Sequence, residues 1–189
     1  VSIVPQENSL TLQAFKTNQI SGAWVVEPWA TRLVEEGGGK VLIDEADLWP
    51  KGRYVTTNLI VRTEYLEQHP DVIRNLIRAE SNAIDLIAKN PTTAKALTNQ
   101  AITAVTTKAL PQSLIDASFA HITFTLDPVP TALRRSAKDA QKVGLLGSVN
   151  LNGIYELSLL NGVLKAQGKA AIVDTPEKVP ASTSTTAKP

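Results

Sequence analysis

The sequence predicts an α/β protein with a parallel-rich sheet and helices in its first third and mostly helices in the rest. Up to residue 61, short β-prone segments alternate with segments of helical pattern. Such alternation predicts parallel strands joined by crossover helices. Beyond residue 61, apolar residues recur at steps of three and four, which is typical of helices with one apolar stripe.

Four segments have the composition of strands. Residues 22–26 are almost entirely apolar, as a buried strand requires, and residues 54–61 are rich in β-branched side chains. Residues 2–4 and 40–43 are shorter apolar segments of the same kind. We therefore expect about four strands in the first third of the chain.

Two helices are expected between these strands. Ser9 is a suitable N-cap residue for the first helix, and Asn18 can end it. Pro28 suits the first turn of the second helix, because its missing N–H would have no partner inside the helix. Glycines at positions 37–39 end this second helix.

The chain from residue 62 to residue 173 reads as a series of helices. The expected starts of these helices are Thr63, Asp71, Asn90, Pro111, Pro130 and Gly153. Residues 122–126 fit a strand or a loop equally well. From residue 174 onward the composition is Pro, Ser, Thr, Ala and Lys, which predicts a disordered tail over residues 174–189.

The composition excludes several classes of function. A formal net charge of +1 gives no field that would favour nucleic acid, and no apolar run approaches the ~20 residues of a transmembrane helix. Without cysteine, the chain has no disulfide and no thiolate ligand or nucleophile. His69 and His121 lie in no metal-ligand pattern, so we expect no metal site and no cofactor.

No catalytic motif is present. There is no Gly-x-Ser-x-Gly sequence, and the glycines at 37–39 end a helix rather than opening one, which excludes a phosphate loop. A basic helix face carries no interleaved aromatic residues and is typical of a solvated surface. This face consists of Arg134, Arg135, Lys138 and Lys142. We therefore expect no catalytic residues and no enzyme.

The chain also lacks methionine, so Val1 is not a translation start and we expect a processed N-terminus or a fragment. The predicted strands point the same way. About four strands precede roughly a hundred mostly helical residues, whereas a typical sheet has ~5–6 strands. Further strands in a preceding part would give the helices a sheet to cover.

The best candidate for a ligand site is the turn between residues 22–26 and the following helix. In open α/β sheets, ligands bind beyond the carboxyl ends of strands, where helix N-termini present free N–H groups. Glu27 and Trp29 occupy such a turn. Most turns of this kind bind nothing, and Trp24 in the middle of the segment fits a core position.

Residues 22–34, Gly-Ala-Trp-Val-Val-Glu-Pro-Trp-Ala-Thr-Arg-Leu-Val, resemble a segment of the substrate-binding proteins of ABC importers of the aliphatic sulfonate, nitrate and taurine type. Further similar segments follow in the order of that family. They are Leu48-Trp49-Pro50, residues 54–62, Tyr65-Leu66, residues 69–72, residues 151–160 and residues 163–168. The resemblance spans residues 1–173, and its motifs are specific for the family rather than for one ligand.

The resemblance implies the C-terminal part of a two-lobed periplasmic-binding-protein-like fold of type II. Residues 1–56 would be the end of lobe two, and residues 57–173 the C-terminal half of lobe one. A small anionic or zwitterionic solute, such as an aliphatic sulfonate, would be held by hinge closure and delivered to an ABC permease in the membrane. The resemblance further implies a monomer in the periplasm or at the outer face of the cytoplasmic membrane, with no nucleic-acid partner.

In the family, the turn after the Gly-Ala-Trp segment faces the cleft, so the resemblance makes Glu27, Trp29 and Trp24 ligand-binding candidates. Glu27 would repel a bare anion. We therefore expect it to accept a hydrogen bond from an amine or hydroxyl of the solute, or to act in the hinge. Backbone N–H groups beyond Pro28 would hold the anionic end.

Two alternatives stay open. The same two-lobed fold serves a pyrimidine synthase of thiamine biosynthesis, whose cysteine-rich motif has no counterpart in this cysteine-free chain. A ligand-sensing domain of a regulator would adjoin a DNA-binding or kinase segment, and the C-terminal sequence resembles neither. The sequence therefore favours a transport function over both.

Overall fold

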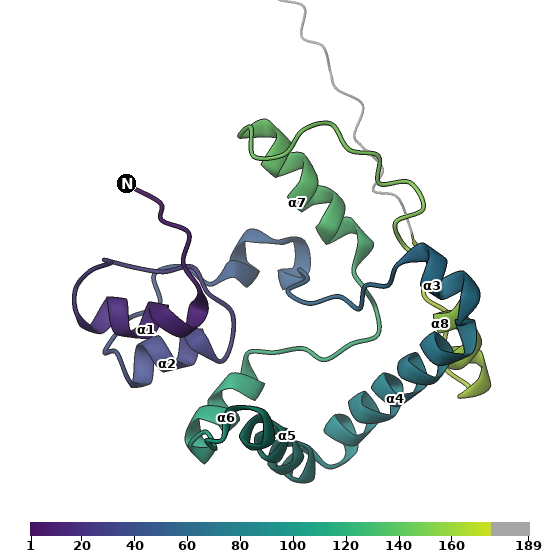
Figure 1. The fold of residues 1–189 in the computed structure, drawn as a ribbon, viewed down its shortest axis with the longest axis horizontal. Helices are drawn as coiled ribbons and strands as arrows, with labels where there is room; N and C mark the ends of the chain where they lie inside the picture. The colour runs from purple at the N-terminus through teal and green to yellow at the C-terminus, as the bar shows by residue number, and fades with distance from the viewer. Residues whose placement is uncertain (175–189) are drawn as a thin grey trace, which may run out of the picture. The chain divides into compact units, whose positions relative to one another are not determined.

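The structure of the protein is a computed structural model that describes residues 1–174. Within these residues it is helical, with eight α-helices and two short 3-10 helices (Figure 1). The chain divides into two units. The first contains Val1–Gly52 and Ile60–Leu126, and the second contains Arg53–Leu59 together with residues 127–174.

The predicted parallel-rich sheet is wrong, because no residue from 1 to 174 lies in a β-strand. The segments predicted as strands are residues 2–4, 22–26, 40–43 and 54–61. A strand requires a neighbouring strand to pair its backbone N–H and C=O groups, and β propensity mainly reports how well side chains fit an existing sheet. In this structure their apolar side chains face solvent instead, with Leu42 93% and Ile60 87% exposed.

The first two helices pack against each other and lie side by side in Figure 1. They are α1 (Asn8–Lys16) and α2 (Trp29–Glu35). Leu12 of α1 and Leu33 of α2 are buried at their contact faces. Gly37 follows α2, and a Cβ there would lie 2.7 Å from the Leu33 carbonyl oxygen and 3.2 Å from Phe15. Only glycine therefore fits where the chain turns back over this pair.

Two short helices and four longer ones complete the first unit. They are η1 (Glu45–Leu48), η2 (Pro50–Gly52), α3 (Thr63–Gln68), α4 (Pro70–Lys89), α5 (Pro91–Thr106) and α6 (Gln112–Ala120). Consecutive helices from α3 to α6 contact each other, and α6 also contacts α2. The expected cap of α5 is confirmed, because Asn90 Oδ1 accepts a hydrogen bond from the Thr93 N–H at 3.2 Å. Residues 122–126 form a loop.

Several helix starts differ from the expected ones by a few residues. The N-cap position of α1 is Glu7 rather than Ser9, and that of α4 is His69 rather than Asp71. The last helix begins at Ser158, five residues after Gly153. Gly153 instead has a φ of +74°, which glycine adopts readily in a turn.

The second unit contains α7 (Pro130–Lys142) and α8 (Ser158–Ala166). The Arg134 guanidinium donates two hydrogen bonds to the Asp174 carboxylate, at 2.6 and 2.5 Å, and lies 5.9 Å from the centre of the Tyr155 ring. Burial raises the pKa of the Tyr155 hydroxyl, whose oxygen has no hydrogen-bond partner among the described residues. The predicted tail lies, apart from Asp174, outside the described residues.

Two asparagines use the same device to fasten a returning segment to a helix. In α5, the Asn99 side chain donates to the Leu110 carbonyl at 2.8 Å and accepts from the Leu110 N–H at 2.9 Å. In α8, Asn161 donates to the Ile172 carbonyl at 3.0 Å and accepts from its N–H at 2.8 Å. Each side-chain amide therefore satisfies both backbone groups of one residue, as a neighbouring strand would.

No helix among the described residues is both long and apolar enough to cross a membrane.

Candidate functional site

The candidate turn lies at the start of α2, where the chain changes from an extended segment to a helix. The Val26 carbonyl accepts hydrogen bonds from the N–H groups of Trp29 and Ala30, at 2.9 and 3.2 Å. Pro28 occupies the N-cap position, and its carbonyl accepts from the Arg32 N–H at 3.0 Å. The Glu27–Pro28 peptide bond is cis.

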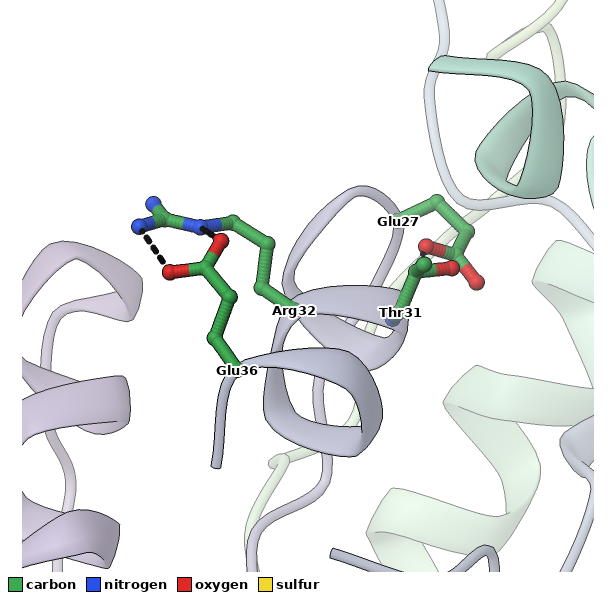
Figure 2. A network of polar contacts seen from close by, with 4 residues as sticks. All are labelled: Glu27, Thr31, Arg32 and Glu36. Carbon is green, nitrogen blue, oxygen red and sulfur yellow. Dashed lines mark hydrogen bonds and ion pairs between the residues drawn. The ribbon is translucent and has the colours of Figure 1, made fainter. Parts of the chain in front are cut away.

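Glu27 caps this helix with its side chain. Its Oε2 accepts a hydrogen bond from the Thr31 N–H at 3.1 Å (Figure 2). Together with the bonds above, this leaves none of the first four N–H groups of α2 without an acceptor. The structure therefore offers no free backbone N–H beyond Pro28 for the anionic end of a solute, in contrast to the expectation from the sequence.

The second carboxylate oxygen of Glu27, Oε1, is available as a hydrogen-bond acceptor. Glu27 is half-buried, and its Oε1 has no hydrogen-bond partner among the described residues. A carboxylate oxygen in this state accepts hydrogen bonds from amines and hydroxyls. Glu27 can therefore cap α2 and bind a donor group of a solute at the same time.

Trp29 is flanked by a cation that is itself held in place. The Arg32 guanidinium lies 4.8 Å from the centre of the Trp29 ring. Arg32 also donates two hydrogen bonds to Glu36, from Nε at 2.7 Å and from Nη2 at 3.1 Å. These bonds raise the pKa of the Arg32 guanidinium and lower the pKa of the Glu36 carboxyl. Trp29 is thus the ring of a cation–π contact whose cation is fixed by a fork of hydrogen bonds.

The turn and the fork lie on different sides of α2. Figure 2 shows Arg32 and Glu36 extending together from one side of the helix, while Glu27 lies on the other side with Thr31. The arrangement contains two carboxylates and one guanidinium, so its formal charge is −1. Glu36 already neutralises the charge of Arg32. The group that remains for binding a solute in this region is therefore the Oε1 acceptor of Glu27. This favours a ligand with a hydrogen-bond donor over a bare anion.

Trp24 lies outside this arrangement. Its side chain is 67% exposed on the extended segment before the turn, so it is not the core residue that its position in an apolar segment suggested. Glu27 and Trp29 thus both lie at the start of α2, Glu27 with Thr31 and Trp29 with Arg32, whereas Trp24 is open to solvent.

Sequence reasoning missed the Arg32–Glu36 fork, whose Arg32 guanidinium lies against the Trp29 ring. A signal was present, because Arg32 and Glu36 are four residues apart and side chains at this spacing meet on a helix. The hydrogen bond of Glu27 to its own helix was also missed. It depends on the conformation of one side chain, which no spacing rule specifies.

The histidines and the acidic residues form no metal site in the part of the chain that the structure describes. No group of three or more His, Cys, Asp or Glu side chains there could hold a metal ion. His69 lies between α3 and α4 with its ring 4.6 Å from that of Tyr65, and His121 follows α6.

A hollow of about 440 Å³ in the first unit contains none of the three candidates. It lies between α4, α5, α6 and the following loop, and its lining is mostly apolar. Its two charged residues, Lys95 and Asp116, are paired with each other at 2.7 Å. The hollow therefore adds no polar group to the candidate site.

Comparison with known families identifies the class of protein. A family model described as the NMT1-like family matches residues 1–103, which is more than half of the chain and includes all three candidates. The chain therefore belongs to the NMT1-like family. This family covers ABC substrate-binding proteins and related members of thiamine-synthesis type. No curated protein and no solved structure matches the chain.

Family membership confirms the resemblance at the level of the family. The sulfonate, nitrate and taurine type of importer stays a prediction.

Proposed function

We propose that this chain is part of the solute-binding component of an ABC import system. The component captures a small anionic or zwitterionic solute, such as an aliphatic sulfonate, by hinge closure and delivers it to the permease. The family match over residues 1–103 carries this proposal, because the family covers ABC substrate-binding proteins.

Glu27 and Trp29 are the solute-binding residues of this proposal, and Trp24 is the third candidate. The free Oε1 of Glu27 supports a solute that carries an amine or a hydroxyl beside its anionic group. Taurine has an amine and isethionate a hydroxyl at the position where ethanesulfonate has neither. These three solutes therefore differ in the one feature that Glu27 would recognise.

Thermal-shift measurements with these sulfonates, nitrate, bicarbonate and aminopyrimidines test the function. A solute that binds the native state raises the apparent melting temperature by mass action. We expect a shift with taurine and isethionate and a smaller shift with ethanesulfonate. A folded protein that responds to none of the panel would contradict the proposal.

The variant Glu27→Gln tests the role of the carboxylate. Glutamine retains an acceptor for the Thr31 N–H, so α2 stays capped, but it removes the charge. A hydrogen bond to a charged group contributes about 1.5–3 kcal/mol, so we expect a loss of taurine affinity of about 10- to 100-fold and almost none for ethanesulfonate. Glu35→Gln, an exposed carboxylate of the same helix, is the control. Equal affinities in E27Q and the parent protein for all three solutes would rule out this role.

A thiamine-pyrimidine synthase-like function is the second candidate, because the family also includes members of that kind. The aminopyrimidine arm of the screen addresses it. A shift with aminopyrimidines alone, followed by turnover of the bound compound, would favour the enzyme over the importer.

The proposed role places the protein, as a monomer, in the periplasm or at the outer face of the cytoplasmic membrane. Release by osmotic shock, or retention with the membrane fraction, would support this placement. Recovery only with the cytosolic fraction would contradict it.

A further inference from the structure

Three polar side chains of the second unit meet where the chain returns to α7 after α8. Arg134 of α7 donates two hydrogen bonds to Asp174, from Nη1 to Oδ1 at 2.6 Å and from Nη2 to Oδ2 at 2.5 Å. Tyr155 precedes α8, and the centre of its ring lies 5.9 Å from the same guanidinium. All three residues belong to the second unit, so the cluster is built within one unit of the structure.

The fork between Arg134 and Asp174 has the geometry in which arginine binds a free carboxylate. Two N–H groups of one planar guanidinium face the two oxygens of one carboxylate, and this match is the reason that arginine prefers such anions. The two residues are 40 positions apart, so the pairing comes from the fold and not from helix spacing. The Asp174 side chain thus occupies the place that the carboxylate of a ligand would take.

The Tyr155 hydroxyl is a second donor, which Asp174 leaves unused. Its oxygen is buried and has no hydrogen-bond partner among the described residues. Such groups are rare in native proteins, because a buried donor without an acceptor is unfavourable. Burial raises the pKa of this hydroxyl, so it stays protonated at neutral pH. It can therefore donate to an acceptor oxygen that Asp174 does not supply.

The Asp174 carboxylate is held in a way that allows it to be exchanged. The side chains of Arg134 and Asp174 are 25% and 30% exposed, so a small molecule in water reaches the fork. Ile172, two residues earlier, is fixed separately by two hydrogen bonds with Asn161. Val173 between them is 71% exposed and buries little apolar surface. Asp174 can therefore leave Arg134 without a loss of core packing.

The charges near the fork allow another anion to take the place of Asp174. Asp127 is a further carboxylate whose charge acts on the Tyr155 hydroxyl. It is paired with Arg53, whose Nη2 lies 2.8 Å from Asp127 Oδ2. When Asp174 leaves, the Arg134 guanidinium loses its counter-charge while it is still largely shielded from water. It then attracts an anion of similar size.

We propose that Arg134 and Tyr155 form a binding site for a small carboxylate with a further acceptor oxygen, and that Asp174 fills this site until such a ligand displaces it. The carboxylate of the ligand accepts both hydrogen bonds of the Arg134 fork. Its further oxygen accepts the hydrogen bond of the Tyr155 hydroxyl. The site is independent of the proposed solute-binding residues, because Glu27 and Trp29 belong to the first unit.

Calorimetric titrations of the full chain with acetate, glycolate and malonate test this site. Acetate supplies a carboxylate alone, whereas glycolate adds a hydroxyl and malonate adds a second carboxylate. Asp174→Asn removes the charge that competes for Arg134. We expect D174N to bind malonate about three- to tenfold more tightly than the parent protein, as suits the loss of a partly exposed ion pair. Acetate should bind more weakly than the other two.

Further changes in the D174N background assign the contacts of the ligand. Arg134→Gln should abolish the binding of all three compounds, and Arg134→Lys, which keeps the charge without the fork, should weaken it. Tyr155→Phe removes only the hydroxyl. It should reduce the affinity for malonate and glycolate about tenfold and leave that for acetate unchanged. Circular dichroism checks that each variant keeps its helix content.

Asp139→Asn is the matched control, because it makes the same change of charge at a carboxylate of α7 that pairs with Arg135 and Lys142 instead. It should bind malonate as the parent protein does. If D174N binds malonate no more tightly than D139N, the site is wrong. Undiminished malonate binding when Arg134→Gln is added to D174N would equally overturn it.

NMR spectra of the isotopically labelled parent protein test the displacement without any substitution, and so remain decisive if D174N does not fold. Malonate should shift the amide signals of Asp174 and Tyr155 together and saturably, relative to sodium chloride at equal ionic strength. The signal of Asn99, in the first unit, should not move. Signals of Asp174 and Tyr155 that move only as they do in sodium chloride would overturn the proposal.

Discussion

Glu27 combines a structural task with the proposed binding task, and its two oxygens allow the tasks to be separated. Oε2 accepts the Thr31 N–H at the start of α2. Glu27→Ala removes this acceptor and should lower the free energy of unfolding by about 1 kcal/mol, as the loss of a capping side chain does. Glu27→Gln keeps an acceptor and should lower it much less. Urea unfolding followed by tryptophan fluorescence measures both.

The same stability measurements show whether a loss of taurine affinity in E27Q comes from lost binding or from a destabilised fold. If E27A and E27Q are equally stable, Glu27 does not cap α2 in solution. If E27Q alone loses taurine affinity while its stability is unchanged, the carboxylate acts on the solute rather than on the fold.

The Arg32–Glu36 fork makes a stability contribution that depends on pH. The hydrogen bond from Arg32 lowers the pKa of the Glu36 carboxyl in the folded state. The contribution is therefore fully present above the ordinary glutamate pKa of about 4.3, and it is lost as pH falls through the lowered folded value. Since the pair is a partly exposed one at a spacing of four residues, we expect only about 0.3–0.5 kcal/mol.

Urea midpoints of the parent protein and of Glu36→Gln, measured from neutral pH down to about pH 3, test this linkage. The parent should be the more stable at neutral pH, and the two should converge at the acidic end. A difference that stays constant over the whole range would mean that the fork is not formed in solution.

At the scale of elements, two asparagine clamps fasten a returning segment to its helix, Asn99 in α5 and Asn161 in α8. Asn99 and Asn161 each make two hydrogen bonds to one backbone residue. Replacement by alanine should lower the stability of the corresponding unit by about 1–3 kcal/mol, because two bonds are lost and two backbone groups lose their partners. Asn99→Asp keeps the size and the acceptor but loses the donor, so it should also destabilise.

Circular dichroism in urea measures these clamp variants. Thr92→Ala, at an exposed position of α5, is a control for the change of an exposed helix residue near Asn99. If N99A and N161A are both as stable as the parent protein, hydrogen bonds to water replace those of the two side-chain amides without a loss of stability.

The helices could be predicted from the sequence because their signals are local. Asn90 followed by Pro91 marks the start of α5, and Pro130 marks the start of α7. The displaced starts of α1 and α4 lie two residues before the expected ones, where Glu7 and His69 hold the N-cap positions without a capping side-chain hydrogen bond. Patterns of caps and apolar spacing therefore locate a helix well and its first residue less well.

The sheet could not be predicted from the same kind of pattern. Residues 22–26 and 40–43 have apolar, β-branched side chains, but pairing depends on a partner strand that a local pattern does not specify. The site is an intermediate case. The sequence placed Glu27 and Trp29 at the start of one helix, whereas the bond that occupies the Thr31 N–H depends on where the Glu27 side chain lies.

At the scale of the whole molecule, the two units interleave along the chain. Residues 53–59 belong with residues 127–174, and residues 60–126 belong with the N-terminal residues. The Arg53–Asp127 pair joins residues that are 74 positions apart, and no composition shift marks either one. Such long-range organisation lies beyond the reach of periodicity and capping rules.

The tryptophans make the two units separately visible during unfolding. All three lie in the first unit, at positions 24, 29 and 49, so fluorescence reports that unit alone. Circular dichroism reports the helices of both units. The first unit has the larger set of buried side chains, whereas those of the second come mainly from Ala132, Leu160, Val163 and Leu164.

We therefore expect two unfolding transitions that do not coincide. The second unit should unfold at a lower urea concentration, because it buries less apolar surface, and the circular dichroism signal should change before the fluorescence does. Asn161→Ala should shift only the early part of the circular dichroism curve, and Asn99→Ala should shift the fluorescence curve. Coincident curves in the parent protein, displaced together by both variants, would mean that the units unfold as one cooperative body.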